Sequence, residues 1–371
     1  MTTTGPPPAT GAWREGDAAG GRLFADLGDL ALESGEVLPD VRIAYETWGE
    51  PSADGSNAVL VLHALTGDSH VTGDAGPGHP SPGWWSGLVG PGRPIDTDRF
   101  FVVAPNILGG CQGSTGPSSP GPDGRPWGAR FPALTVRDQV AAEQLLADRL
   151  GVARWAGVTG GSAGGMRALE WAISRPESVA TLFLLAASAS ASADQIGLST
   201  TQVEAIVSDP AFAGGDYYDA APGDGPHRGL ELARRIAHLS YRSAGELAER
   251  FGRTVGEDGR WAVESYLAHH GDKLARRFDA NTYVTLTRAM DSHDVGRDRG
   301  GVPAALGRIT ARTVVAGIDS DRLYPLSQQE EIAASVPTCD YLDVVESVHG
   351  HDGFLVELDA VAPLARRLLG T

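Results

Sequence analysis

The stretch WAGVTGGSAGGMRALEW, residues 155–171, determines how the rest of the chain is interpreted. Apolar and β-branched residues lead into GGSAG at 160–164, and apolar residues at helical spacing follow directly. The pattern predicts a strand, a sharp turn and a helix, with Ser162 at the apex. A G-x-S-x-G turn needs small residues around the serine because strand and helix approach closely there. Since the turn exposes the hydroxyl beside a helix N-terminus, we expect a nucleophile.

Length, charge and cysteine content limit the class of protein. A chain of 371 residues can bury a large core, either as one α/β domain with an insertion or as two domains. A net charge of -17 without any basic run argues against nucleic-acid and anionic membrane partners. No apolar run reaches membrane-spanning length, and two cysteines fit a reducing compartment. We therefore expect a globular, cytoplasmic protein.

On both sides of the turn, strand-like and helix-like segments alternate. Several strands are continuous apolar runs, which is typical of strands buried on both faces. The alternation favours a mostly parallel sheet flanked by helices. In such sheets ligands bind beyond the carboxyl ends of the strands, where Ser162 falls. Before the turn we expect antiparallel strands within 21–50, strands at 57–63 and 98–105 and a helix at 135–150, and after it a strand at 179–187.

The pattern changes at residue 188, after which helical periodicity dominates for more than a hundred residues. Strand-like runs return at 312–317 and 338–345, and a helix-like segment closes the chain. The Pro, Gly, Thr and Ala content of the first residues is typical of disorder. We therefore expect a disordered leader at 1–20, an α/β-hydrolase core at 21–187 and 300–371, and a helical lid at 188–299 inserted between late strands.

A serine nucleophile needs a base, and the base needs an acid to fix its tautomer. In an α/β-hydrolase the acid follows a late strand and the histidine follows the last strand. Asp319 and Asp321 follow the strand-like run at 312–317, and both are candidates for the acid. His349 and His351 follow the last strand-like run, and both are candidates for the base.

Two backbone N–H groups should stabilise the oxyanion that forms when the serine attacks a carbonyl carbon. The residue after the nucleophile, Ala163, supplies one, and Leu65 in the loop HALTG after an early strand supplies the other. The sequence has no H-E-x-x-H motif and no cysteine cluster. We therefore expect no metal and no tightly bound cofactor.

Several longer stretches carry more information than the serine turn: HALTGDSH (63–70), FFVVAPNILGGCQGSTGPSS (100–119), GGSAGGMRALEW (160–171), SDRLYP (320–325) and ESVHGHDGF (346–354). Taken together, these stretches resemble the homoserine O-acetyltransferase family, and the resemblance covers nearly the whole chain after about residue 20. The loop sequence NILGGCQGSTGPSS (106–119) and GHD (350–352) are more specific than the serine turn alone. One departure is Ala163, where the family commonly has methionine.

The resemblance implies an α/β-hydrolase fold with a helical lid, a homodimer formed through the lid helices, and ping-pong transfer of an acetyl group from acetyl-CoA to homoserine. It also implies that the product feeds methionine synthesis. A succinyl donor, a serine acceptor, a plain esterase and a binding protein that lacks catalysis are the alternatives. The implied roles are Ser162 as nucleophile, Asp321 as acid, His351 as base, and Arg234 and Asp352 as contacts to the homoserine carboxylate and amine.

Overall fold

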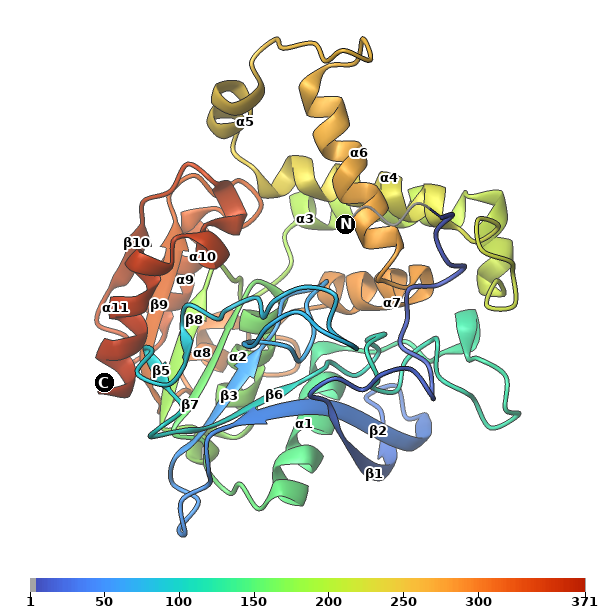
Figure 1. The fold of residues 1–371 in the computed structure, drawn as a ribbon. Helices are drawn as coiled ribbons and strands as arrows, with labels where there is room; N and C mark the ends of the chain where they lie inside the picture. Colours follow the sequence, from blue (N-terminus) through green and yellow to red (C-terminus); the bar gives the residue numbers. More distant parts are fainter. Residues whose placement is uncertain (1–4, 371) are drawn as a thin grey trace.

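The computed structural model describes residues 5–370, and its centre is an eight-stranded sheet with helices on both faces (Figure 1). The strand order is β1-β2-β6-β3-β7-β8-β9-β10. Strand β2 pairs antiparallel with β1 and β6, whereas every later neighbour pairs in parallel. The predicted fold class is confirmed. The strands are β1 (Leu23–Ala31), β2 (Val37–Trp48), β3 (Ala58–Leu62), β6 (Phe101–Pro105), β7 (Gly157–Gly161), β8 (Thr181–Leu185), β9 (Arg312–Ile318) and β10 (Leu342–Val345), with β4 (Val89–Gly90) and β5 (Ile95–Asp96) forming a separate pair.

Strand β3 shows why an apolar run becomes a central strand, because all five of its residues are buried. Successive side chains of a strand point to opposite faces. Leu60 and Leu62 belong to an apolar core that includes residues of helices α1 (Val136–Leu150) and α2 (Ala163–Ser174). Val59 and Val61 belong to a second core, which includes residues of helix α11 (Leu358–Leu369). The sheet therefore separates two cores and is held from both sides.

Six α-helices lie between β8 and β9 in sequence, and Figure 1 shows the first five, α3 to α7, grouped together on one side of the sheet. These five helices fall inside the region 188–299, where helical periodicity was expected. Whether this helical insertion acts as a lid, and where its domain boundaries lie, stay predictions. The helices are α3 (Ala193–Val207), α4 (His227–Tyr241), α5 (Ala244–Phe251), α6 (Ala262–Ala275) and α7 (Ala280–Asp291).

The N-terminal segment differs from expectation, since disorder does not hold for residues 5–20. Thr10 Oγ1 donates to Asp279 Oδ1 at 2.8 Å, and the Gly11 N–H donates to the Phe278 carbonyl oxygen at 3.1 Å. The Trp13 N–H donates to the Cys111 carbonyl oxygen at 2.9 Å. A weakly apolar segment is thus fixed by hydrogen bonds to the insertion and to a core loop, which composition does not reveal. Residues 1–4 of the expected leader lie outside the described residues.

The closing segment, expected as one helix, is two helices that are separated at Glu357. The first, α10 (Gly353–Val356), directly follows His351 and Asp352, and the second is α11. Helices α8 (Val302–Leu306) and α9 (Leu326–Ser335) complete the late part of the fold. Among residues 5–370, no helix has both the length and the apolar character needed to cross a bilayer.

Candidate active site

Ser162 lies between β7 and α2 with φ 55° and ψ −127°, a conformation that non-glycine residues rarely adopt. A Cβ atom on Gly160 would lie 2.5 Å from the backbone carbon of Gly164. A Cβ atom on Gly164 would lie 2.1 Å from the carbonyl oxygen of Leu62. Both positions therefore require glycine, as the G-x-S-x-G pattern indicates. Strain of this kind costs about 1–3 kcal/mol and concentrates at functional sites.

Asp321 and His351 come together at the carboxyl ends of β9 and β10. His351 Nδ1 lies 2.6 Å from Asp321 Oδ2, and both side chains are buried. The other oxygen, Asp321 Oδ1, accepts hydrogen bonds from the backbone N–H groups of Leu323 at 2.8 Å and Tyr324 at 2.9 Å. A carboxylate fixed in this way holds the proton of His351 on Nδ1 and leaves Nε2 free to accept another.

The same carboxylate changes the acidity of the imidazole. Burial by itself lowers the pKa of His351, because a charged ring is poorly solvated inside the protein. The charge of Asp321, its hydrogen bond and the charge of Asp352 outweigh burial and raise the pKa of His351 above its usual 6.5. His351 is therefore a stronger base than an ordinary histidine.

The other candidates for the acid and the base, Asp319 and His349, make different contacts. Asp319 Oδ1 accepts the backbone N–H of Ser347 at 2.9 Å, which ties together the loops after β9 and β10. His349 Nδ1 lies 3.3 Å from Glu246 Oε1, and 36% of the His349 side chain is exposed. The structure thus brings Asp321 and His351 together and places Asp319 and His349 in structural contacts.

Tyr324 connects the serine to this pair, although sequence reasoning did not single it out. A side-chain hydrogen bond joins Tyr324 and Ser162, and the Tyr324 ring stacks on His351 with centroids 4.8 Å apart. Burial raises the pKa of Tyr324, so its hydroxyl stays neutral. Its place in SDRLYP, three residues after Asp321, was the available signal. Ser162, Tyr324 and His351 therefore form one group of contacts.

The two expected oxyanion donors lie where the sequence puts them, Leu65 in the loop after β3 and Ala163 at the start of α2. Within the described part of the chain, neither N–H group donates to a backbone carbonyl oxygen. The loop that carries Leu65 is held by Arg167, whose Nη2 donates to the His63 carbonyl oxygen at 2.6 Å. Arg167 is fully buried and pairs with Glu143 at 2.5 Å. The interior charges of Arg167 and Glu143 were not anticipated, and the arginine in GGMRALEW was their only signal.

Arg234 of α4 and Asp352, the residue that follows His351, line one pocket of about 250 Å³. Arg234 Nη1 donates to Thr66 Oγ1 at 3.4 Å, and its guanidinium lies 5.4 Å from the centre of the Tyr241 ring. Arg234 has no ion-pair partner among residues 5–370. Asp352 Oδ2, in contrast, lies 3.1 Å from Arg242 Nη2. Of these two predicted substrate contacts, the guanidinium of Arg234 is therefore unpaired and the carboxylate of Asp352 is paired.

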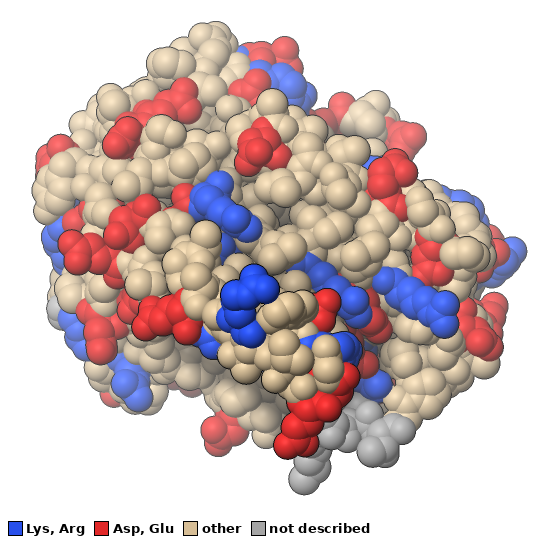
Figure 2. All heavy atoms as spheres, turned by 90° about the horizontal axis from the view of Figure 1, so that it is seen from above, with Lys and Arg blue, Asp and Glu red and all other residues tan. Residues whose placement is uncertain are grey.

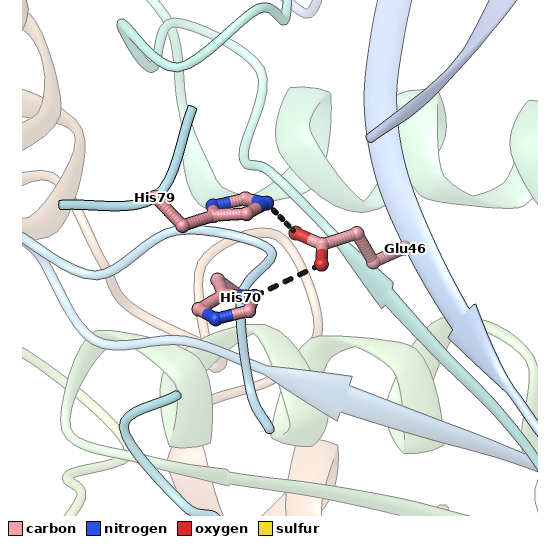
Figure 3. A group of neighbouring side chains, drawn as sticks. All are labelled: Glu46, His70 and His79. Atoms are coloured by element: carbon pink, nitrogen blue, oxygen red, sulfur yellow. Dashed lines mark hydrogen bonds and ion pairs between the residues drawn. The ribbon is translucent and has the colours of Figure 1, made fainter. Parts of the chain in front are cut away.

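One group of side chains, Glu46, His70 and His79, has the composition of a metal site (Figure 3). Its geometry does not suit a metal ion, because the two imidazole rings are parallel within 8° with centroids 3.8 Å apart. Nitrogen lone pairs lie in the ring planes, so two stacked rings cannot both point at one ion about 2 Å away. Glu46 instead accepts hydrogen bonds from Ser69 at 2.7 Å and His70 at 3.0 Å. The group fixes a wall of the pocket to strand β2.

Comparisons with known proteins show which family this chain is similar to. Residues 57–358 match the family model described as the alpha/beta hydrolase fold. Homoserine O-acetyltransferase from Thermobifida fusca (strain YX) is 62% identical over 99% of this chain and 98% of its own. A crystal structure of homoserine O-acetyltransferase from Bacillus anthracis has a TM-score of 0.86 at 24% identity, covering 94% of this chain and 97% of its own. Esterase E22 has a TM-score of 0.85 at 24% identity, covering 94% of this chain and 99% of its own.

The fold and the matches define an enzyme of the α/β-hydrolase class. Structures at 24% identity show the fold alone, and an esterase and a transferase share it equally well. The full-length match at 62% identity is more specific. The chain belongs to the homoserine O-acetyltransferase family, whose members are acyltransferases.

Proposed function

We propose that this enzyme transfers an acetyl group from acetyl-CoA to the hydroxyl of L-homoserine, giving O-acetyl-L-homoserine and coenzyme A. The observation that carries the proposal is the buried Asp321–His351 pair grouped with a strained Ser162, next to a pocket that contains Arg234 and Asp352. The name of the 62% identical relative supports the choice of substrate. No resident cofactor takes part, and the product would feed methionine synthesis.

In the first half-reaction, Ser162 Oγ attacks the thioester carbonyl carbon while His351 Nε2 takes the serine proton. The negative charge moves to the carbonyl oxygen, where the N–H groups of Leu65 and Ala163 stabilise it. When the tetrahedral intermediate collapses, the carbon–sulfur bond breaks and His351 returns the proton to the leaving thiolate. The enzyme then carries an acetyl ester on Ser162, and free coenzyme A departs.

In the second half-reaction, the homoserine hydroxyl attacks the acetyl ester and His351 takes its proton. Arg234 can bind the homoserine carboxylate through two parallel hydrogen bonds, and Asp352 can accept from the ammonium group. Collapse of the second intermediate breaks the ester bond to Ser162, and His351 returns the proton to the serine oxygen. Holding the hydroxyl in line can supply several of the roughly 7–11 kcal/mol that orientation is worth.

Transfer requires that water stays away from the acetyl ester. The helical insertion would exclude water as a lid over the carboxyl ends of the strands. A small cavity of about 40 Å³ between insertion and core favours a short acyl group such as acetyl. The cavity is lined in part by Leu65, Met166, Tyr241 and Tyr324.

We also propose a homodimer formed through the insertion, in the cytoplasm. Support comes from large apolar side chains that are exposed on helices α3 and α4, because exposed apolar surface favours association. Both cysteines are free, which fits a reducing compartment. The exposed side chains are Ile196, Val207, Leu232 and Leu239.

The decisive experiment is mass spectrometry of the protein mixed with acetyl-CoA alone, which should place one acetyl group on Ser162. Adding homoserine should remove it and release O-acetylhomoserine. Thiol release with succinyl-CoA, or with serine as acceptor, tests the two alternatives on the same fold. Rapid hydrolysis of a p-nitrophenyl ester without any effect of homoserine would instead identify a plain esterase.

A further inference from the structure

The chain contains a single lysine among its 30 lysine and arginine residues, and that lysine lines the pocket described above. Lys273 lies near the end of helix α6 and is exposed. The same pocket is lined by Arg234, Arg242 and Arg277, against the carboxylates of Asp68 and Asp352. A protein with a net charge of -17 therefore has a locally basic pocket.

On the face seen from above, several Lys and Arg side chains gather near the middle of the view, with acidic side chains beside them (Figure 2). A hollow lined by charges of one sign concentrates ions of the opposite sign.

Three of the four cations in the pocket have no carboxylate partner among residues 5–370, namely Arg234, Lys273 and Arg277. Arg242 differs, because it pairs with Asp352 and with Glu246 at 3.1 Å each. Arg277 Nη1 donates to the Thr66 carbonyl oxygen at 3.0 Å, and the carboxylate of Asp68 acts on its charge without forming an ion pair with it. Unpaired like charges close together repel one another unless an anion lies between them.

The pKa values of two histidines in the pocket, His238 and His270, are lowered by burial and by the positive charges nearby. Burial and, after it, the nearby charge of Arg234 together lower the pKa of His238 to about 2. Burial likewise lowers the pKa of His270 to about 4, with further contributions from Arg234 and Lys273. Both rings are therefore neutral at pH 7, and the permanent charge of the pocket comes from its lysine and arginines.

The basic side chains come from two helices that face each other. Arg234 and His238 are four residues apart on α4 and share one helix face, and Arg242 directly follows the end of that helix. Lys273 lies within α6, and Arg277 follows its end. The third wall is the loop after β3, which Glu46 holds through Ser69 and through His70 (Figure 3). The cations thus surround a preformed space, and the exposed Lys273 marks its solvent side.

We propose that the Lys273–Arg277 side of this pocket binds the phosphate groups of the acyl-coenzyme A donor. The inference rests on the proposed function, and it names the part of the site that holds the nucleotide end of the donor. Homoserine has one carboxylate and one ammonium group, so Arg234 and Asp352 are enough for it. The remaining cations match a ligand with several negative charges, such as the diphosphate of coenzyme A. Ping-pong order lets donor and acceptor occupy the pocket in turn.

Lys273 allows a clean test, because its head group is exposed and makes no ion pair with another described residue. We would measure KM for acetyl-CoA and for S-acetylpantetheine, which lacks phosphate, in the wild type, Lys273→Gln and Lys273→Glu. The matched control is Arg228→Gln, which removes one exposed charge of α4 outside the pocket.

For Lys273→Gln, KM for acetyl-CoA should rise about tenfold, as expected when a charge-assisted contact is lost. Lys273→Glu should raise it further, and added salt should reduce the difference between variants. KM for S-acetylpantetheine, KM for homoserine and kcat should stay at wild-type values, and so should every value for Arg228→Gln. An unchanged KM for acetyl-CoA, or equal rises for both donors, would overturn the proposal.

A second measurement needs no turnover and separates this proposal from the proposed function. Reductive methylation labels Lys273, and peptide mapping distinguishes it from the N-terminal amine. Coenzyme A should protect Lys273 from labelling at concentrations where pantetheine does not, and dephospho-coenzyme A should show whether the 3′-phosphate contributes. Equal protection by pantetheine, or protection by inorganic phosphate as strong as that by coenzyme A, would contradict a donor site. A wild type that releases no thiol from acetyl-CoA and homoserine would instead contradict the proposed function.

Discussion

The two sides of the active site are built in opposite ways. On the sheet side, the charged groups are paired: Asp321 accepts three hydrogen bonds, one of them from His351, and Arg167 is paired with Glu143. On the side of the insertion, Arg234, Lys273 and Arg277 have no ion-pair partners among the described residues. The fully paired side can fix reacting groups in advance, whereas the unpaired side gains its partners from ligands. The comparison indicates that the loops at the ends of the strands supply the catalytic groups, whereas the helical insertion supplies most of the charges that would bind ligands.

The largest effect should come from the sheet side. Ser162→Ala removes the nucleophile, and we expect kcat to fall by about 10⁶, as for a triad serine. Thiol release from acetyl-CoA in the presence of homoserine measures this, and mass spectrometry should show no acetylated protein. The melting temperature should not fall, because the mutation removes one oxygen atom. Thiol release at the wild-type rate would show that catalysis does not use this serine.

A pair of aspartates two residues apart gives the next test. Asp321→Asn keeps the shape of the side chain but cannot hold His351 in the required tautomer, so kcat should fall by about 10⁴. Asp319→Asn is the matched control, because among residues 5–370 the Asp319 side chain accepts a hydrogen bond only from the Ser347 N–H. This variant should change kcat by less than about tenfold. Equal losses in both variants would mean that the loops after β9 and β10, rather than the pair, determine activity.

These two residues also show what the sequence could and could not predict. Strand and helix patterns predicted the sheet, and helix α1 was predictable because Thr135 and Asp138 form its capping box and Gly151 ends it with φ 71°. Their position after a strand limited the candidates for the catalytic acid to Asp319 and Asp321. Which of them forms a hydrogen bond with His351 depends on contacts between loops that are distant in sequence. Family resemblance chose Asp321, and the distance to His351 agrees with that choice.

The unpredicted features are contacts that cross the fold. Residues 5–20 look disordered by composition, yet Thr10 reaches Asp279, which lies 269 residues away in sequence. Tyr324 beside Ser162 and the buried Arg167–Glu143 pair likewise join separate elements. The basic pocket was not predicted either, because a net charge of -17 conceals a local excess of the opposite sign. Local patterns specify elements, whereas these features depend on how the elements assemble.

On the insertion side, neighbouring arginines of α4 give a third test. Arg234 faces the pocket without an ion-pair partner, whereas Arg235 pairs with Glu231 at 3.1 Å. Arg234→Gln should lower kcat/KM for homoserine by about 10–100-fold, which corresponds to a lost charge-assisted hydrogen bond. Acetylation of Ser162 by acetyl-CoA alone should keep at least a tenth of its rate, and Arg235→Gln should behave like the wild type. A loss confined to the acetylation step would place Arg234 on the donor instead.

The smallest effect concerns pH and returns to the sheet side. The pKa of His351 is raised because the charge and hydrogen bond of Asp321 outweigh burial, and a protonated ring cannot accept the serine proton. Activity should therefore fall as pH decreases, and the midpoint of this acidic limb in a plot of kcat/KM should lie above the usual histidine value of 6.5. In Asp321→Asn the remaining activity should show a lower midpoint, since burial then acts without the carboxylate. In Arg235→Gln the midpoint should match that of the wild type. If the midpoint were below 6.5 in the wild type and unchanged in Asp321→Asn, the Asp321–His351 pair would not set the protonation of the base.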